Sequence, residues 1–452
     1  MVGESLFTGR KAKEGYMRRL LLVLLCLGFA ATSFAEGMFD YGFYLRLRQE
    51  YVENVFDYNE GDLIVDDNYF RLKTSVWGKW NFSDNASLYA RLTAEPKYFM
   101  DTDGQMAGGE DLRDQEIFID NLYLDLKNVF GMPVDLRLGR QDFLMTHGEG
   151  FVMLDGTPYD GSRSVYFNAV KATWKFDEKN SLDVIYTQNT DEDKYLPVIN
   201  DQDRKLLFPG MDERAVILYG RFRANDNVAI EPYYIHKTED AHVRSGNNVA
   251  KLKLNTIGNR MVCNFEPWKF RGELAYQFGE YEDDREREGL GGYAFLTRSF
   301  KEARFSPSLD VGYAYLSGEK DPYAGEDQGW NPVFSKWPWI SELYVFGSAI
   351  ERGEPGYWSN VQVLRAKLDM KMTGKTGLWV AYNYLRANEN PAPAVFFGTG
   401  KTRGHLPQVQ LTHKFNKNID GLVLLEYFMP GKFYADSRDN ALFFRWQLQM
   451  NF

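Results

Sequence analysis

The chain has 452 residues, a formal net charge of −10 and an aromatic content of 16%. An acidic chain with no basic face or tail excludes a nucleic-acid partner, which needs cations to meet phosphates. Two cysteines, Cys26 and Cys263, exclude a disulfide framework and a thiolate metal site. The aromatic residues suit strands and membrane-interface girdles. No linker or composition break divides the chain, which favours one large unit over several soluble domains.

The first 35 residues have the pattern of a secretion signal. Met17-Arg18-Arg19 supplies positive charge, residues 20–31 are apolar, and Ser33-Phe34-Ala35 places small residues at the two cleavage-defining positions. We therefore predict that residues 1–35 are an N-terminal extension and a cleaved signal peptide, with the true start at Met17. Residues 36–452 are then the mature protein. The alternative is a retained membrane anchor.

Alternating strands follow from the predicted cleavage site to the C-terminus. Apolar and polar residues alternate with a period of two in the segments 41–48, 70–76, 88–95, 134–138, 216–223 and 364–371. The last strand shows it most clearly, because its even-numbered residues from Leu442 to Phe452 are apolar and Arg445 lies on the other face. An apolar face with a charged reverse fits lipid outside and water inside. The terminal Phe452 resembles the signal that the outer-membrane assembly machinery recognises.

No other apolar stretch approaches the ~20 residues of a transmembrane helix, so a membrane protein of this pattern must be a closed barrel. Short connections with turn chemistry alternate with nine long ones, which lie around 55–66, 99–114, 142–162, 189–212, 238–248, 280–289, 317–356, 388–402 and 430–439. We predict an all-β fold. It is a single closed transmembrane antiparallel β-barrel of about 18 strands, with short periplasmic turns and long extracellular loops, in the bacterial outer membrane. The apolar segment 339–350 is assigned to the loop 317–356, because another strand would make the count odd.

A barrel of this size encloses a lumen that side chains alone do not fill. With regular pleating, more cations than carboxylates face that lumen, although the external loops are acidic. The predicted substrate pathway consists of Arg46, Arg48, Arg71, Lys73, Arg91, Arg137, Arg221, Arg223, Arg271, Arg365, Lys367 and Arg445. Arginine pairs bidentately with carboxylates, and a narrow lumen of one charge concentrates solutes of the other. The expected substrate is an anionic saccharide of the uronic-acid type. The alternative is that these cations form ladders with carboxylates of neighbouring strands and stiffen the wall.

Three motifs resemble the alginate-export family of outer-membrane porins. They are Leu136 to Phe143 followed by Gly148 and Gly161, Pro307 to Gly318 followed by Asn331 to Phe334, and Gly404 to Tyr434. The resemblance covers essentially the whole mature chain. It implies an 18-stranded monomeric barrel whose arginine-lined pore exports an anionic polysaccharide.

The chain also departs from that family at two places. Leu406 and Gln408 stand where the family often carries carboxylates, and the turn at 416–418 is very short where the alginate exporter is expected to have a long periplasmic gating loop. These departures leave open a general sugar or organic-anion porin. A structural or adhesive barrel plugged by its loops is the third alternative, supported by the length of the loop 317–356.

The sequence does not predict an enzyme. Its five histidines accompany no G-x-S-x-G elbow and no paired-histidine motif. We expect no cofactor, although a divalent cation bound to the acidic external loops is an alternative to simple solvation; those loops carry Glu282, Asp283, Asp284, Glu319, Asp321, Glu326 and Asp327. The expected partners are outer-membrane lipid and lipopolysaccharide, the barrel assembly machinery and the anionic saccharide. No nucleic acid is expected, and the barrel is predicted to be a monomer.

Overall fold

The computed structural model describes residues 38–452 with several gaps. The gaps are residues 57, 59–65, 101–110, 114, 144–145, 154–165, 200–210, 245–246, 322–324, 336–338, 348–355, 392–396 and 437. The predicted signal peptide and its cleavage site lie outside the described residues.

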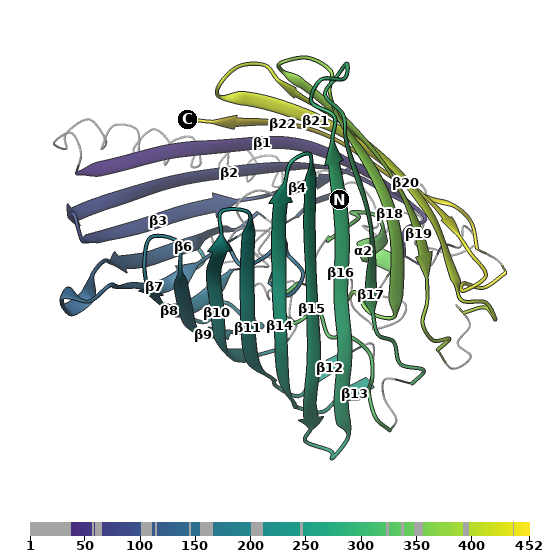
Figure 1. Ribbon diagram of the computed structural model, residues 1–452, viewed down its shortest axis with the longest axis horizontal. Coiled ribbons are helices and arrows are strands. Elements are labelled where there is room, and N and C mark those ends of the chain that lie inside the picture. The colour runs from purple at the N-terminus through teal and green to yellow at the C-terminus, as the bar shows by residue number, and fades with distance from the viewer. Residues whose placement is uncertain are drawn as a thin grey trace, which may run out of the picture.

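Eighteen long antiparallel strands close into one barrel (Figure 1). In the first half these are β1 Phe39–Glu53, β2 Asp66–Ser83, β3 Ala86–Ala94, β6 Ile117–Leu126, β7 Val134–Gln141, β8 Phe167–Lys175, β9 Ser181–Asn189, β10 Glu213–Asn225 and β11 Val228–Glu239. In the second half they are β14 Leu252–Phe265, β15 Trp268–Tyr281, β16 Glu286–Ser299, β17 Ser308–Leu316, β18 Val361–Lys371, β19 Thr376–Arg386, β20 Thr402–Lys414, β21 Ile419–Pro430 and β22 Ala441–Asn451. Each strand pairs with its neighbours, and β1 pairs with β22 from Tyr44↔Asn451 to Glu53↔Leu442, which closes the ring.

Four short strands lie in the connections at one end of the barrel. β4 Lys97–Phe99 and β5 Asp111–Arg113 extend the sheet beside β2, and β12 His242–Arg244 pairs with β13 Asn247–Val249 between β11 and β14. Among the described residues the helical elements are η2 Val129–Gly131 and α2 Tyr344–Gly347. None of these helices has the length and apolar character to cross a membrane.

The two ends of the barrel differ in their connections. We call the end with the start of β1 and the end of β22 the turn end, because the strands there are joined by short turns such as residues 84–85 and 266–267. The opposite end is the loop end. It carries eight of the nine predicted long connections. The segment 339–350 lies in the connection between β17 and β18, as predicted, and contains α2, which sits inside the wall in Figure 1.

One predicted long loop is wrong. Residues 280–289 were expected to form an external loop, but β15 runs to Tyr281 and β16 begins at Glu286, so only four residues connect the strands. The charged side chains there are compatible with a strand because the hairpin continues past the apolar band. The glycines of β16 have a packing reason: a Cβ on Gly291 would lie 2.6 Å from Cε3 of Trp330.

The faces of the strands follow the predicted alternation. On β10, Val216 and Leu218 are exposed on the outer face, whereas Ile217 and Tyr219 are fully buried on the lumen face. The largest hydrophobic cluster lies inside the barrel. There, Phe151 and Trp330 from two loops pack with residues of the lumen wall. Loops therefore fill much of the space that the wall side chains leave.

Candidate permeation pathway

Strand alternation puts all twelve predicted pathway residues on the lumen face, and ten of them fall into two groups with different surroundings. The first group is a set that we call the β1–β2 ion-pair cluster; it consists of Arg46, Arg48, Arg71, Lys73 and Arg445 with Glu50 and Glu95. Its side chains are at most 8% exposed. This group corresponds to the ladder that the sequence left as an alternative.

Two carboxylates organise the cluster. Glu50 accepts from Arg48 and Arg71 at 3.2 Å each and from Nε of Arg445 at 2.7 Å. Glu95 accepts from Nη2 of Arg46 at 2.5 Å and Nη2 of Arg71 at 2.7 Å. Charged groups taken out of water are stable only when paired in this way. The cluster therefore braces the seam where β1 meets β22.

Next to the cluster, aromatic rings line the wall toward the turn end. Trp77, Tyr89 and Tyr123 stack in sequence from β2 to β6, with ring centroids 5.9 and 5.0 Å apart. The guanidinium of Arg137 lies 4.0 Å from the Tyr123 ring and pairs with both oxygens of Asp125 at 2.7 and 2.9 Å. Arg91 is likewise held between Asp120 and Asp142 at 2.8 Å each.

The connection between β7 and β8 folds into the lumen. We call its residues 146–153 the inner segment. The inner segment runs along the wall from β9 to β16: His147 bonds Asp183 of β9 at 2.9 Å, and Phe151 packs on Tyr293 of β16. Gly148 and Gly150 have φ of +81° and +85°, a conformation that favours glycine. This double turn directs Glu149 at the wall.

Glu149 meets two arginines there. Its Oε1 accepts from Nη2 of Arg260 on β14, and its Oε2 accepts from Nη1 of Arg271 on β15, both at 2.6 Å. Sequence reasoning placed Arg271 in the lumen but missed Arg260 and Glu149. The Gly-Glu-Gly at 148–150 was the available signal, since an acidic residue between two glycines in a loop indicates a tight turn that presents a carboxylate.

The connection between β17 and β18 also enters the lumen. Glu426 of β21 accepts the backbone N–H groups of Glu342 and Leu343 at 3.2 and 3.1 Å, and Gln408 donates to it at 2.9 Å. Gln408 and Leu406, the positions where the family often carries carboxylates, are buried against this connection. An amide suits Gln408 because it donates to both Glu426 and the Ile340 carbonyl.

The second group of predicted residues, together with Lys171 of β8, forms an arc of partly exposed cations. Arg137, Arg221, Arg271 and Lys367 are between 25 and 31% exposed. Lys171 and Arg365 have no carboxylate within salt-bridge distance among the residues the structure describes. We call these six residues the cationic arc. Arg223 lies exposed at the turn end, where a hollow of about 410 Å³ is lined by Lys175, Arg221 and Arg223.

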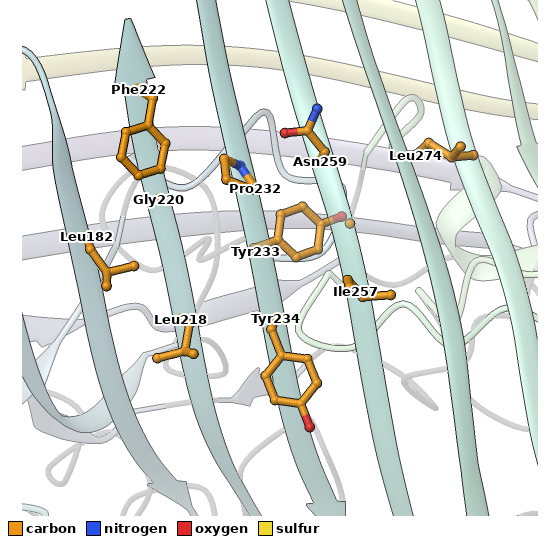
Figure 2. A pocket seen from close by; sticks show the side chains of 11 residues that line it. Leu182, Leu218, Gly220, Phe222, Pro232, Tyr233, Tyr234, Ile257, Asn259 and Leu274 are labelled. Atoms are coloured by element: carbon orange, nitrogen blue, oxygen red, sulfur yellow. The ribbon is translucent and has the colours of Figure 1, made fainter.

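A larger hollow, of about 670 Å³, lies on the outer wall over β9 to β15. Figure 2 shows its apolar rim of Leu182, Leu218, Phe222 and Leu274 around Pro232. It forms because Gly220 lacks a side chain and the Pro232 ring is short. No lumen cation lines it, so it is not part of the pathway.

The described residues show no group of three or more His, Cys, Asp or Glu arranged to hold a metal ion. In the acidic connections, Glu319 instead accepts the backbone N–H of Lys320 and Asp327 pairs with Arg287. His147 lies between Asp183, whose Oδ2 is 2.9 Å from its Nε2, and the Thr146 hydroxyl, 2.9 Å from its Nδ1, and its ring packs edge-on against Tyr219.

Comparison with known proteins agrees with this architecture. Solved structures with the same fold include a BenF-like porin from Pseudomonas fluorescens, with 11% identity, a TM-score of 0.58 and coverage of 93% of this chain and 99% of that one. Pseudomonas aeruginosa OccK2 (OpdF) in complex with glucuronate has 9% identity, a TM-score of 0.55 and coverage of 91% and 97%. At this identity the likeness concerns the fold alone. No curated protein matches the chain.

The family model described as alginate export matches residues 38–447, which is nearly the whole chain. The match and the porin fold together indicate an outer-membrane channel rather than an enzyme. This confirms the resemblance drawn from the three sequence motifs. The chain belongs to the alginate export family of outer-membrane porin-type barrels.

Proposed function

We propose that this channel passes anionic saccharides of the uronic-acid type through its lumen. The observation that carries the proposal is the cationic arc of Arg137, Lys171, Arg221, Arg271, Arg365 and Lys367. Four of these cations also pair with carboxylates, but all six are partly exposed, so a solute can reach them, whereas the cations of the β1–β2 ion-pair cluster are buried. The proposed substrate pathway therefore follows the arc, and the cluster has a structural role.

The arc extends over neighbouring parts of the wall. The register sets Arg137 opposite Lys171, and it sets Arg365 and Lys367 opposite Gly312 and Asp310. A carboxylate moving along the lumen would therefore pass from one cation to the next, and the partly screened field of the arc would favour anions over neutral solutes. One similar barrel carries glucuronate in its solved structure, a sugar acid of the class proposed here.

A second candidate is a channel for small organic anions. It is favoured by the turn between β20 and β21, where only residues 415–418 join the strands and no long turn-end loop is present. Both candidates share the cationic arc and differ in the size of the solute.

Proteoliposome swelling separates these candidates. We expect glucuronate to enter several-fold faster than glucose, which has similar size and no charge. Arg365→Gln should reduce that ratio, and Arg298→Gln should leave it unchanged because Arg298 lies against Trp268 and Phe300 outside the arc. Entry of glucose at the same rate as glucuronate would contradict the proposal. Entry of small carboxylates but not of uronate oligomers would favour the second candidate.

A further inference from the structure

We propose that Arg260 and Arg271 form a carboxylate-binding subsite that Glu149 occupies as a built-in ligand, and that the carboxylate of a permeating solute displaces it. This inference rests on the proposed function and names one subsite within it. It also assigns a task to the inner segment, because Glu149 belongs to that segment and not to the barrel wall.

The contact geometry is that of a bound carboxylate. Each oxygen of Glu149 accepts from a different guanidinium, Oε1 from Arg260 and Oε2 from Arg271, at 2.6 Å. Charge-assisted hydrogen bonds of this length are among the stronger polar contacts in proteins. A free carboxylate could occupy the same position with the same two donors.

The wall holds both arginines in place independently of Glu149. Nη1 of Arg260 donates to Glu231 at 2.9 Å, and Nη2 of Arg271 donates to Asp310 at 2.7 Å. Glu231 in turn accepts from the Tyr219 hydroxyl at 2.6 Å. Because the guanidinium groups are fixed from behind, they stay oriented when their front partner leaves. A preorganised pair binds a ligand without the cost of ordering itself.

Exposure separates this pair from the β1–β2 ion-pair cluster. The side chains of Arg260, Glu149 and Arg271 are 11, 20 and 25% exposed, whereas Glu50 is 2% exposed. A solute in the lumen can therefore reach the first set. Gly148 and Gly150 flank Glu149, so the peptide that carries the carboxylate has two flexible joints.

Arg365 is a neighbouring cation that the incoming anion can contact. It lies opposite Gly312, two residues from the Asp310 that holds Arg271, and its Nε is buried without a hydrogen-bond partner. A solute carboxylate would meet Arg365 first and then exchange with Glu149. The exchange replaces one carboxylate by another, so the charge of the subsite does not change and no bond other than hydrogen bonds is made or broken.

The test is block of single-channel chloride current by glucuronate in planar bilayers. In the wild type, glucuronate must displace Glu149, so the half-blocking concentration should be high. Glu149→Gln removes the competing charge, and we expect at least a tenfold lower half-blocking concentration. Adding Arg271→Gln to that variant should reverse the gain, because one of the two donors is then missing.

Glu342→Gln is the matched control, because Glu342 is also a loop carboxylate that pairs with a lumen arginine, Arg445 at 2.7 Å. The half-blocking concentration of glucuronate in Glu342→Gln should equal that in the wild type. Heat-modifiable migration on gels shows whether each variant is folded, and glucose shows whether block needs a carboxylate. Equal half-blocking concentrations in folded wild type and Glu149→Gln, in a channel that prefers anions, would overturn the subsite alone. A wild type without anion preference would overturn the proposed function as well.

Discussion

Burial, and not only position on the lumen face, distinguishes the lumen arginines from one another. Arg48, Arg71 and Arg445 all face the lumen, yet all three donate to Glu50 and are buried. Arg221 faces the same lumen, pairs with Asp183 and remains 31% exposed. The same residue type therefore braces one wall and, in the proposed pathway, contacts solutes on the other.

Removing the charge of Glu50 should weaken the barrel. Glu50→Gln leaves three buried guanidinium groups short of a carboxylate, and breaking a buried pair in this way costs about 3–5 kcal/mol. We expect a lower urea midpoint in detergent micelles, followed by tryptophan fluorescence, with unchanged ion selectivity. Asp283→Asn, which alters an exposed pair with Arg285 at 3.0 Å, is the control and should leave the midpoint in place. A Glu50→Gln midpoint equal to that of the wild type would contradict the bracing role.

At the scale of elements, the inner segment depends on contacts that join distant parts of the chain. Two of its polar anchors are His147 on Asp183 of β9 and Glu149 on β14 and β15. Phe334, from the connection between β17 and β18, donates its backbone N–H to Val152 at 3.0 Å. The two inward connections therefore support each other.

Acidification should loosen the inner segment. Burial lowers the pKa of His147, although Asp183 acts in the opposite direction and the cations Lys171 and Arg221 add to the lowering. The folded protein thus holds His147 neutral. Its stabilising contribution is complete above the unfolded value of about 6.5 and is lost as the pH falls through the lower folded pKa.

Single-channel recordings at about pH 7.5 and about pH 5 test this dependence, since histidine changes charge in this range. We expect more frequent conductance steps at the lower pH in the wild type. His147→Gln, which keeps a side chain able to bond Asp183, should show much less change. The same change in both proteins would assign the effect to another group.

The sequence predicts the strands better than the contacts of the inward connections, because strand patterns are local and those contacts are not. Strand alternation is a local property, so the wall, its faces and the lumen position of residues such as Arg271 followed from the pattern. The bond from Glu149 to Arg271 spans 122 positions of the chain, and nothing local indicates which arginine a loop carboxylate will meet. The sequence does not distinguish the hairpin between β15 and β16 from a loop, because strand ends that extend beyond the apolar band carry charged residues just as loops do.

For the whole molecule, the closed wall and the inward connections together define the channel. The full chain has a net charge of −10, yet an arc of partly exposed cations runs along part of the lumen. Charges near a narrow, low-dielectric passage act on a solute more strongly than distant charges screened by salt. Ion preference should therefore follow the arc and not the net charge.

The reversal potential across a planar bilayer with a potassium chloride gradient tests this claim most directly. We expect the wild-type channel to prefer chloride over potassium, because the cations of the arc are closest to the passing ion. Replacing Arg365 and Lys367 by glutamine should move the reversal potential toward zero. A wild-type channel that prefers potassium would contradict the account.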